Sequence, residues 1–237
     1  MKRLKPRPRP PRPSETVILL HGLGRSGRSF ALMAGALRAA GFAVVNVSYP
    51  STRAPIEKLV AHIDAALAKC ADAERVHFVT HSLGGIVLRL WLSQNAFPRL
   101  GRVVMLGPPN KGSELSDVFG LLPGFRRIVG PAGAQLGAGP RSVPNALGPV
   151  NFDLGVIAGD RGANPISGAL LAKPNDGAVT VESTRIAGMR DHIVLPTTHT
   201  FMMNNPLVIA QTIGFLREGR FEPELTVGEA VRRAFAP

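Results

Sequence analysis

Residues 79–85 read Val79-Thr80-His81-Ser82-Leu83-Gly84-Gly85, and this stretch predicts a strand that turns sharply into a helix. An apolar, β-branched run precedes the turn, and a helix-type apolar run follows it. Gly84 lets the first helical turn close against the strand without a Cβ clash, so Ser82 is forced outward with its hydroxyl above the sheet. Such turns usually read Gly-x-Ser-x-Gly. Here Thr80 takes the first glycine position, so a small β-branched side chain must fit at the strand end.

A serine ahead of a helix is also an ordinary N-cap, so the interpretation depends on a second motif. Residues 17–20 read as a buried strand, followed at once by His21-Gly22-Leu23-Gly24 and then by a helix-type stretch over residues 29–40. This order presents backbone N–H groups to a negatively charged oxygen, such as that of a tetrahedral acyl intermediate. We therefore expect the N–H groups of Leu23 and Leu83 to form an oxyanion hole beside the serine.

Five motifs in a fixed order resemble the alpha/beta hydrolase family, and within it the small bacterial lipases and lipase-like esterases. The resemblance implies an alpha/beta hydrolase fold and a serine hydrolase that acts on carboxylic esters or lipids. Each motif is weakly specific, and their joint order carries the resemblance. The motifs are residues 17–20 with His21-Gly22-Leu23-Gly24, His81-Ser82-Leu83-Gly84-Gly85, Pro108-Pro109-Asn110-Lys111-Gly112-Ser113, Asn175-Asp176-Gly177, and His199.

A serine hydroxyl becomes a strong nucleophile when a histidine removes its proton and a carboxylate orients that histidine. Downstream of Ser82 the chain has two histidines, His192 in a strand-like run and His199 in a loop before the last predicted helix. For the acid, Asp176 lies in a tight Asn-Asp-Gly turn, while Asp160 follows a strand end where a carboxylate also fits. The resemblance favours Asp176 and His199 as the acid and the base. His192 is interpreted as a structural side chain paired with a neighbour.

Length and composition fit one compact domain over residues 14–237, because 237 residues of which 45% are apolar can fill one large core. Predicted strands alternate with predicted helices, which indicates a mostly parallel, twisted α/β sheet with helices on both faces. Ligands bind such sheets beyond the carboxyl ends of the strands, where Leu23, Ser82, Asp176 and His199 all fall. The predicted strands are 17–20, 42–48, 76–80, 102–106, 152–158 and 185–194, and the predicted helices are 29–40, 55–69, 83–95 and 205–217.

Residues 107–148 are rich in Gly and Pro and contain short apolar runs. An insertion of this kind after a central strand is either a small lid or cap over the site or a loop with one short helix. In lipases this region shapes the acyl pocket. The resemblance therefore implies that an acyl chain contacts a wall formed by Phe119, Leu121, Leu122 and Phe125.

Residues 1–13 contain six basic residues, no acidic residue and many prolines, which predicts a disordered, extended arm. The chain has a formal net charge of +12, of which residues 14–237 keep +6. We expect the arm to contact an anionic membrane surface, with a plain solvated tail as the simplest alternative. Nucleic-acid binding is disfavoured, because the arm has no aromatic residue for stacking and the chain shows no nucleic-acid-binding motif.

Other sequence signals concern the location and the cofactors of the protein. No apolar segment long enough for a signal peptide or a membrane span follows the arm, so we expect a cytoplasmic protein, associated at most with a membrane surface. Cys70 is the single cysteine, which excludes an intrachain disulfide. The sequence has no zinc, Walker or dinucleotide motif, so it predicts neither a metal nor a cofactor. His21 and His81 lie inside motifs and are predicted to support loop geometry rather than carry protons.

The resemblance implies acyl transfer through a covalent intermediate on Ser82, with Asp176 and His199 as its partners. The same residues would serve a thioesterase, an amidase or an acyltransferase, because the shape of the pocket selects the leaving group and the acceptor. A non-catalytic lipid- or membrane-binding protein on a hydrolase scaffold is an alternative from a different class. The presence of all three side chains favours an enzyme.

Overall fold

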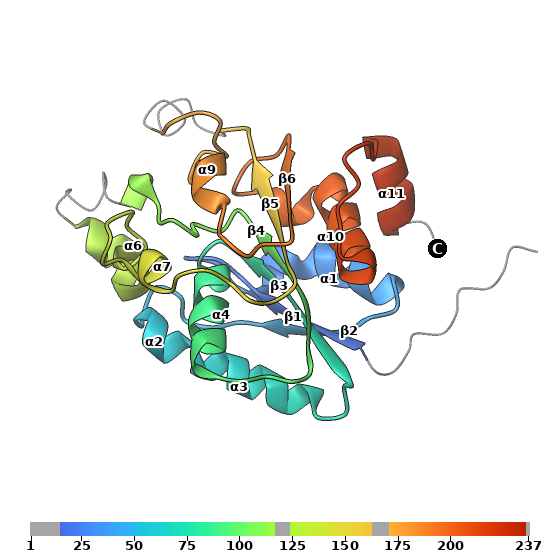
Figure 1. Cartoon of the computed structure of the whole chain (residues 1–237), viewed down its shortest axis with the longest axis horizontal. Coiled ribbons are helices and arrows are strands. Elements are labelled where there is room, and N and C mark those ends of the chain that lie inside the picture. The colour runs from blue at the N-terminus through green and yellow to red at the C-terminus, as the bar shows by residue number, and fades with distance from the viewer. Residues whose placement is uncertain (1–14, 117–123, 163–170, 236–237) are drawn as a thin grey trace, which may run out of the picture.

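The computed structural model describes residues 15–116, 124–162 and 171–235, and a parallel sheet forms its centre (Figure 1). The strand order is β2-β1-β3-β4-β5-β6, and each neighbouring pair is parallel. Because β1 and β3 are neighbours, the two strands that carry the motifs end together, with Leu20 paired with Thr80. The strands are β1 (Glu15–Leu20), β2 (Ala43–Val47), β3 (Arg75–His81), β4 (Leu100–Leu106), β5 (Leu154–Gly159) and β6 (Asp191–Leu195).

Helices cover both faces of the sheet, because successive side chains of a strand point to opposite faces. Val17 and Leu19 of β1 pack in one core with α1, α10 and α11, whereas Ile18 and Leu20 pack in a second core with α2, α3 and α4 (Figure 1). The α-helices are α1 (Ala31–Ala39), α2 (Ile56–Leu59), α3 (Ala61–Leu67), α4 (Leu83–Gln94), α6 (Phe125–Ala134), α7 (Val143–Ala146), α9 (Val181–Thr184), α10 (Pro206–Glu218) and α11 (Val227–Phe235). Short 3₁₀ helices are η1 (Gly27–Phe30), η2 (Ala68–Cys70) and η3 (Met202–Asn204).

This architecture confirms the predicted mostly parallel sheet with helices on both faces, but the strand predicted over residues 185–194 is wrong in its first half. β6 pairs with β5 from Asp191 to Leu195, and a turn precedes it. In that turn Gly188 has a φ of 87°, and a Cβ on it would lie 1.9 Å from the carbonyl oxygen of Val150. The apolar pattern misses the turn because the turn depends on a close approach to another segment.

The described part of residues 107–148 packs against the body of the protein. α6 kinks at Gly130, whose missing side chain allows close contact with the carbonyl of Thr52. The side chain of Gln135 accepts a hydrogen bond from the N–H of Ile56 at 2.8 Å and donates to Glu57. These contacts join the segment to α2, and the role of the segment as a lid stays a prediction.

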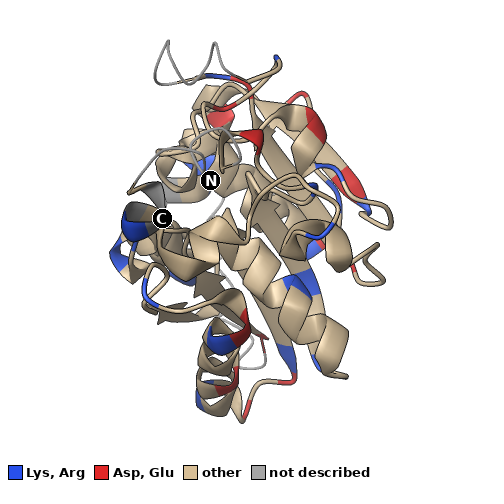
Figure 2. Ribbon diagram, turned by 90° about the vertical axis from the view of Figure 1, so that its left-hand side faces the viewer, with Lys and Arg blue, Asp and Glu red and all other residues tan. Residues whose placement is uncertain are grey.

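Lys and Arg are interspersed among Asp and Glu along the described chain, and most of the ribbon between them carries neither (Figure 2). Within the described ranges, no helix combines the length and the apolar character needed to cross a bilayer. The basic arm, residues 1–13, lies outside the described residues, so its contact with an anionic membrane surface stays a prediction.

Candidate functional site

Ser82 stands at the sharp turn between β3 and α4. Its φ of 51° and ψ of −120° make it the one non-glycine residue with a positive φ in the described part of the chain. Such a backbone costs about 1–3 kcal/mol and persists where the surroundings fix it. Here the N–H of Ser82 donates to the carbonyl of Leu106 at 3.0 Å, and a Cβ on Gly84 would lie 2.4 Å from the carbonyl oxygen of Leu20. The start of α4 is therefore seated directly on the end of β1, as the glycine at position 84 predicts.

Thr80 fits at the crowded strand end because the residue opposite is small. The threonine is fully buried, and a Cβ on Gly85 would lie 3.2 Å from its Oγ1. Gly85 thus leaves room for Thr80, which stands where turns of this kind usually have their first glycine. The Thr80 hydroxyl has no hydrogen-bond partner among the described residues.

His199 and Asp176 form a directly bonded pair. Nδ1 of His199 donates to Oδ2 of Asp176 at 2.7 Å, and the two loops are also joined by the N–H of His199 and the carbonyl of Asp176 at 3.0 Å. Asp176 is 1% exposed, and its second oxygen, Oδ1, accepts the N–H groups of Ala178 and Val179 at 3.0 and 2.8 Å. The turn that holds the carboxylate is therefore ordered by the carboxylate itself.

Two glycines at strand ends leave room for this pair. A Cβ on Gly107, just after β4, would lie 3.0 Å from Oδ2 of Asp176 and 3.1 Å from Nδ1 of His199. A Cβ on Gly159, at the end of β5, would lie 2.9 Å from Cβ of Asp176. Asp160, the other candidate acid, instead lies 3.5 Å from the guanidinium of Arg161. The structure brings Asp176, and not Asp160, to the histidine.

His81, the residue before the serine, supports the His199 loop. Its Nε2 donates to the backbone carbonyl of His199 at 3.0 Å, and the two rings lie 4.7 Å apart between centroids. Burial, reinforced by the charges of His199 and Arg25, holds the pKa of His81 well below its ordinary value. A neutral ring that donates from Nε2 suits the structural role predicted for it.

The loop after β1, which carries Leu23, passes close to the serine. A Cβ on Gly22 would lie 3.2 Å from Cβ of Ser82, so the loop can pass this close because residue 22 lacks a side chain. Neither the N–H of Leu23 nor that of Leu83 donates a hydrogen bond within the described part of the chain. Leu83 is the first residue of α4, where helix N–H groups have no intrahelical partner. Two backbone donors are thus free beside Ser82.

Residues after β2 hold this loop, although no sequence motif marks them. The ring of His21 stacks on Tyr49 with 4.1 Å between centroids and accepts the N–H of Tyr49 at 3.2 Å through Nε2. Its Nδ1 therefore carries the proton and donates to the carbonyl of Gly22 at 2.8 Å. The hydroxyl of Tyr49 donates to the His21 carbonyl, and the N–H of Gly24 donates to Ser51 Oγ at 3.0 Å. No local motif reveals these contacts, because they join residues 27 or 28 positions apart.

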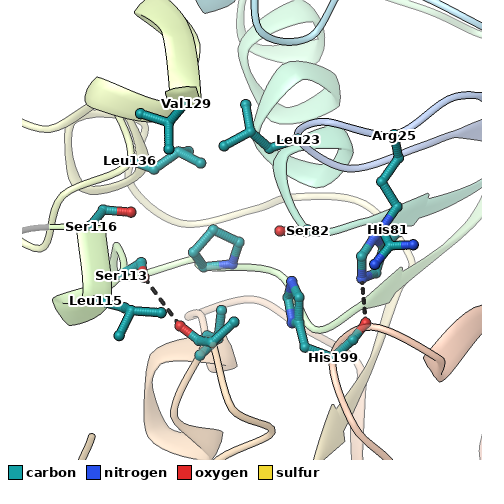
Figure 3. A pocket seen from close by; sticks show the side chains of 13 residues that line it. Leu23, Arg25, His81, Ser82, Ser113, Leu115, Ser116, Val129, Leu136 and His199 are labelled. Carbon is teal, nitrogen blue, oxygen red and sulfur yellow. Dashed lines mark hydrogen bonds between the residues drawn. The ribbon is translucent and has the colours of Figure 1, made fainter. Parts of the chain in front are cut away.

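Ser82, His199 and Leu23 line one cavity of about 260 Å³ (Figure 3). Figure 3 shows the ring of His199 extending toward the Ser82 hydroxyl, although the two form no hydrogen bond in the described structure. In unliganded sites such bonds are often long. The cavity wall is largely apolar, and its described lining includes Leu23, Leu115, Val129, Leu136 and Val179.

The residues predicted for the acyl wall are not among the described side chains. Phe119, Leu121 and Leu122 lie outside the described residues, and of Phe125 the structure describes the backbone at the start of α6. Leu115, Val129 and Leu136 come from the same segment, 107–148, that the sequence analysis assigned to the pocket. The sequence therefore indicates which segment lines the pocket. Which of its side chains do so depends on the path of α6 in the folded protein.

The remaining candidate residues lie apart from this cavity. His192, in β6, is half-buried, and its Nε2 lies 2.9 Å from the hydroxyl of Thr184, a pairing of the kind predicted for it. Across the described ranges, no group of three or more His, Cys, Asp or Glu side chains is arranged to hold a metal ion. The cavity and its surroundings bring together a serine, a histidine–carboxylate pair and two backbone N–H groups that have no acceptor in the described structure.

Comparisons with known proteins support the fold and show the family. Residues 17–212 match the model of the alpha/beta hydrolase family, and no curated protein matches the chain. The solved structure of the Bacillus licheniformis lipase BlEst2 in its mature form is similar, with a TM-score of 0.74 and 20% identity over 90% of this chain and 96% of that one. Phospholipase PlaB from Legionella pneumophila has a TM-score of 0.67 and 17% identity over 93% of this chain and 62% of its own. The metagenomic carboxyl esterase MGS0156 has a TM-score of 0.64 and 19% identity over 97% of this chain and 78% of its own. At sequence identities this low, these similarities show that the fold is shared.

Proposed function

This chain belongs to the alpha/beta hydrolase family, and we propose that it cleaves carboxylic esters through an acyl-enzyme formed on Ser82. The observation that carries the proposal is the strained Ser82 at the head of α4, in a cavity that it shares with the Asp176-bonded His199. A serine on such a turn exposes its hydroxyl to a substrate. An imidazole oriented by a buried carboxylate can activate that hydroxyl.

In the first half-reaction, Nε2 of His199 takes the proton of the Ser82 hydroxyl while Oγ attacks the carbonyl carbon of the ester. The negative charge on the carbonyl oxygen is held by the N–H groups of Leu23 and Leu83, which have no other acceptor in the described part of the chain. The imidazolium then gives its proton to the leaving alcohol as the ester C–O bond breaks. In the second half-reaction a water molecule repeats the attack on the acyl-enzyme, which releases the acid and restores Ser82.

Asp176 orients the base. Its Oδ1 is fixed by two backbone N–H groups, which leaves Oδ2 to accept Nδ1–H of His199. A neutral ring with its proton on Nδ1 presents Nε2 as the proton acceptor. The carboxylate also stabilises the imidazolium that forms during each half-reaction.

The cavity supports an ester with an apolar acyl group. Leucine and valine side chains line the side of the cavity formed by residues 107–148, where burial of each CH₂ group stabilises a bound chain by about 0.8 kcal/mol. The solved structures that share the fold include proteins named as a lipase, a phospholipase and a carboxyl esterase. These names support an ester or a lipid as the substrate of this protein.

Hydrolysis of p-nitrophenyl esters, from acetate to palmitate, tests the proposal. The parent protein should turn over these esters, and Ser82→Ala should lower kcat by roughly 10³-fold or more because it removes the hydroxyl on which the acyl-enzyme forms. Ser93→Ala, which removes an exposed hydroxyl from the same helix, is the matched control and should retain the parent rate. Circular dichroism and thermal unfolding establish that both variants are folded. Absence of turnover in the parent, or equal rates in parent and Ser82→Ala, would contradict the proposal.

A further inference from the structure

Arg25 is the one residue with a permanent charge among the described lining residues of this largely apolar cavity. Its side chain is half-buried and lines the same cavity as Ser82 and His199. No aspartate or glutamate belongs to the described lining. A guanidinium at the wall of such a site requires an explanation, because partial burial of a charge without a partner costs free energy.

The guanidinium of Arg25 has no counter-ion in the described structure. No salt bridge and no side-chain hydrogen bond joins it to another described residue, although its positive charge reaches His81 and contributes to the lowered pKa of that ring. The loop geometry positions it, since the N–H of Arg25 closes a turn onto the carbonyl of Gly22 at 3.3 Å, next to the free N–H of Leu23. The five donors of a guanidinium match two oxygens of a phosphate or a carboxylate.

The position of Arg25 indicates which part of an ester it meets. Figure 3 shows Ser82 between two groups of side chains, with Val129 and Leu136 on one side and Arg25 with His81 on the other. An acyl chain that lies on the apolar side places the ester carbonyl at Ser82. The alcohol part of the same ester then extends toward Arg25.

We propose that Arg25 binds an anionic group on the alcohol part of the substrate, so that the protein prefers acyl esters of a phosphorylated alcohol, such as an acyl glycerophosphate. This substrate class rests on the ester hydrolysis proposed above. The free guanidinium supplies the anion site, and the apolar wall supplies the acyl site. The net positive charge of the chain favours the approach of an anionic substrate.

A matched pair of substrates tests the proposal. 1-Octanoyl-glycerol and 1-octanoyl-glycerol 3-phosphate share the acyl chain and the scissile bond, so the ratio of their kcat/KM values reports the phosphate alone. The parent should prefer the phosphate ester by about tenfold or more, as expected for hydrogen bonds to a charged group. Arg25→Gln should abolish that preference. Arg38→Gln removes the same charge from an exposed position on α1 and should keep the parent ratio.

A binding measurement keeps the test independent of turnover. Calorimetric titration of octyl phosphate should give a Kd for the parent at least about tenfold lower than for Arg25→Gln. Inorganic phosphate should bind the parent more weakly than octyl phosphate, because it lacks the apolar chain. If no ester is cleaved but octyl phosphate binds through Arg25, ester hydrolysis is refuted and the anion site stands.

Three results would overturn the proposal. The first is a parent that cleaves both octanoyl esters with equal kcat/KM, which would leave ester hydrolysis intact and remove the anion preference. The second is an equal loss of preference in Arg25→Gln and Arg38→Gln, which would assign the effect to the overall charge. The third is binding of inorganic phosphate as tight as that of octyl phosphate, which would indicate a free-phosphate site instead of a substrate headgroup site.

Discussion

Asp176 and Asp160 both follow segments near the carboxyl ends of the central strands, but their surroundings set different chemistry. Asp176 is fully enclosed, accepts two backbone N–H groups through one oxygen and His199 through the other. Asp160 faces the guanidinium of Arg161 instead. The pair of carboxylates therefore offers a direct test of which acid orients the histidine.

Asp176→Asn should lower kcat for p-nitrophenyl esters by roughly 10³- to 10⁴-fold, because an amide cannot hold His199 with its proton on Nδ1 and cannot stabilise the imidazolium. Asp160→Asn should retain the parent kcat and is the matched control. Steady-state kinetics on the folded variants provides the measurement. A large loss in Asp160→Asn with a mild loss in Asp176→Asn would reverse the assignment of the acid.

For individual residues, the sequence predicts a role where that role follows from a local motif. Ser82, Leu23 and Leu83 are identified by the strand–turn–helix patterns around them, and Gly84 predicts the close approach of α4 to β1 that the structure contains. The contacts of Tyr49 with His21 and of His81 with His199 are not predictable in the same way. They depend on segments that meet only after the sheet has formed.

Among the helices, α4 has two roles: Ser82 stands at its start, and its Arg89 anchors the segment after β4, residues 107–148. Arg89 of α4 is 4% exposed and donates to the carbonyls of Asn110, Pro144 and Gly148 at 3.2, 3.1 and 2.8 Å. Burial lowers the pKa of its guanidinium to about 10, so the group stays charged at neutral pH. The side chain of Asn110 continues the network to the carbonyl of Thr184 at the end of α9.

Arg89→Met should destabilise the protein by about 3 kcal/mol, because it leaves several buried carbonyl groups without donors. Urea unfolding followed by the fluorescence of Trp91, which is buried on the same helix, measures the free energy of unfolding. Limited proteolysis should show faster cleavage within residues 107–150. Arg38→Met, at an exposed arginine of α1, is the matched control and should keep the parent stability, and unchanged stability of Arg89→Met would contradict the anchoring role.

The sequence predicts most of the long elements, although α11, of nine residues, has no counterpart among the predicted helices. The central strands and α1, α4 and α10 have apolar periodicities that extend over several turns or residue pairs, and their predicted ranges agree with the structure within a few residues. The helices α7 and α9 have four residues each, which is too short for such a period. Contacts with Arg89 and Asn110 hold them in place instead. The turn at Gly188 fails to be predicted for the same reason.

Across the whole molecule, buried neutral histidines make stability depend on pH. His77 is 1% exposed, its Nδ1 accepts the N–H of Arg102 at 2.9 Å, and burial together with the nearby arginines lowers its pKa to about 4. Burial likewise lowers the pKa of His192 to about 4. An unfolded histidine has a pKa near 6.5, so between pH 6.5 and 4 the unfolded chain binds protons that the folded chain does not.

The free energy of unfolding should therefore fall as the pH drops from 6.5 to 4, with no further loss from these groups below pH 4. His77 accounts for at most on the order of 3 kcal/mol of this loss. His77→Gln keeps an acceptor for the Arg102 N–H but cannot titrate, so its stability should vary less steeply over this window. Urea unfolding at half-unit pH intervals measures both slopes, and parallel slopes for parent and variant would contradict the prediction.

The central claim is that Ser82 is the nucleophile, and covalent labelling with an alkyl fluorophosphonate tests it most directly. Attack by Ser82 Oγ on phosphorus expels fluoride and leaves a stable adduct, which peptide mapping by mass spectrometry locates. We expect one adduct, on the peptide that contains Ser82, in the parent and in Ser93→Ala, and none in Ser82→Ala. An unlabelled parent, or an adduct on another residue that persists in Ser82→Ala, would contradict it.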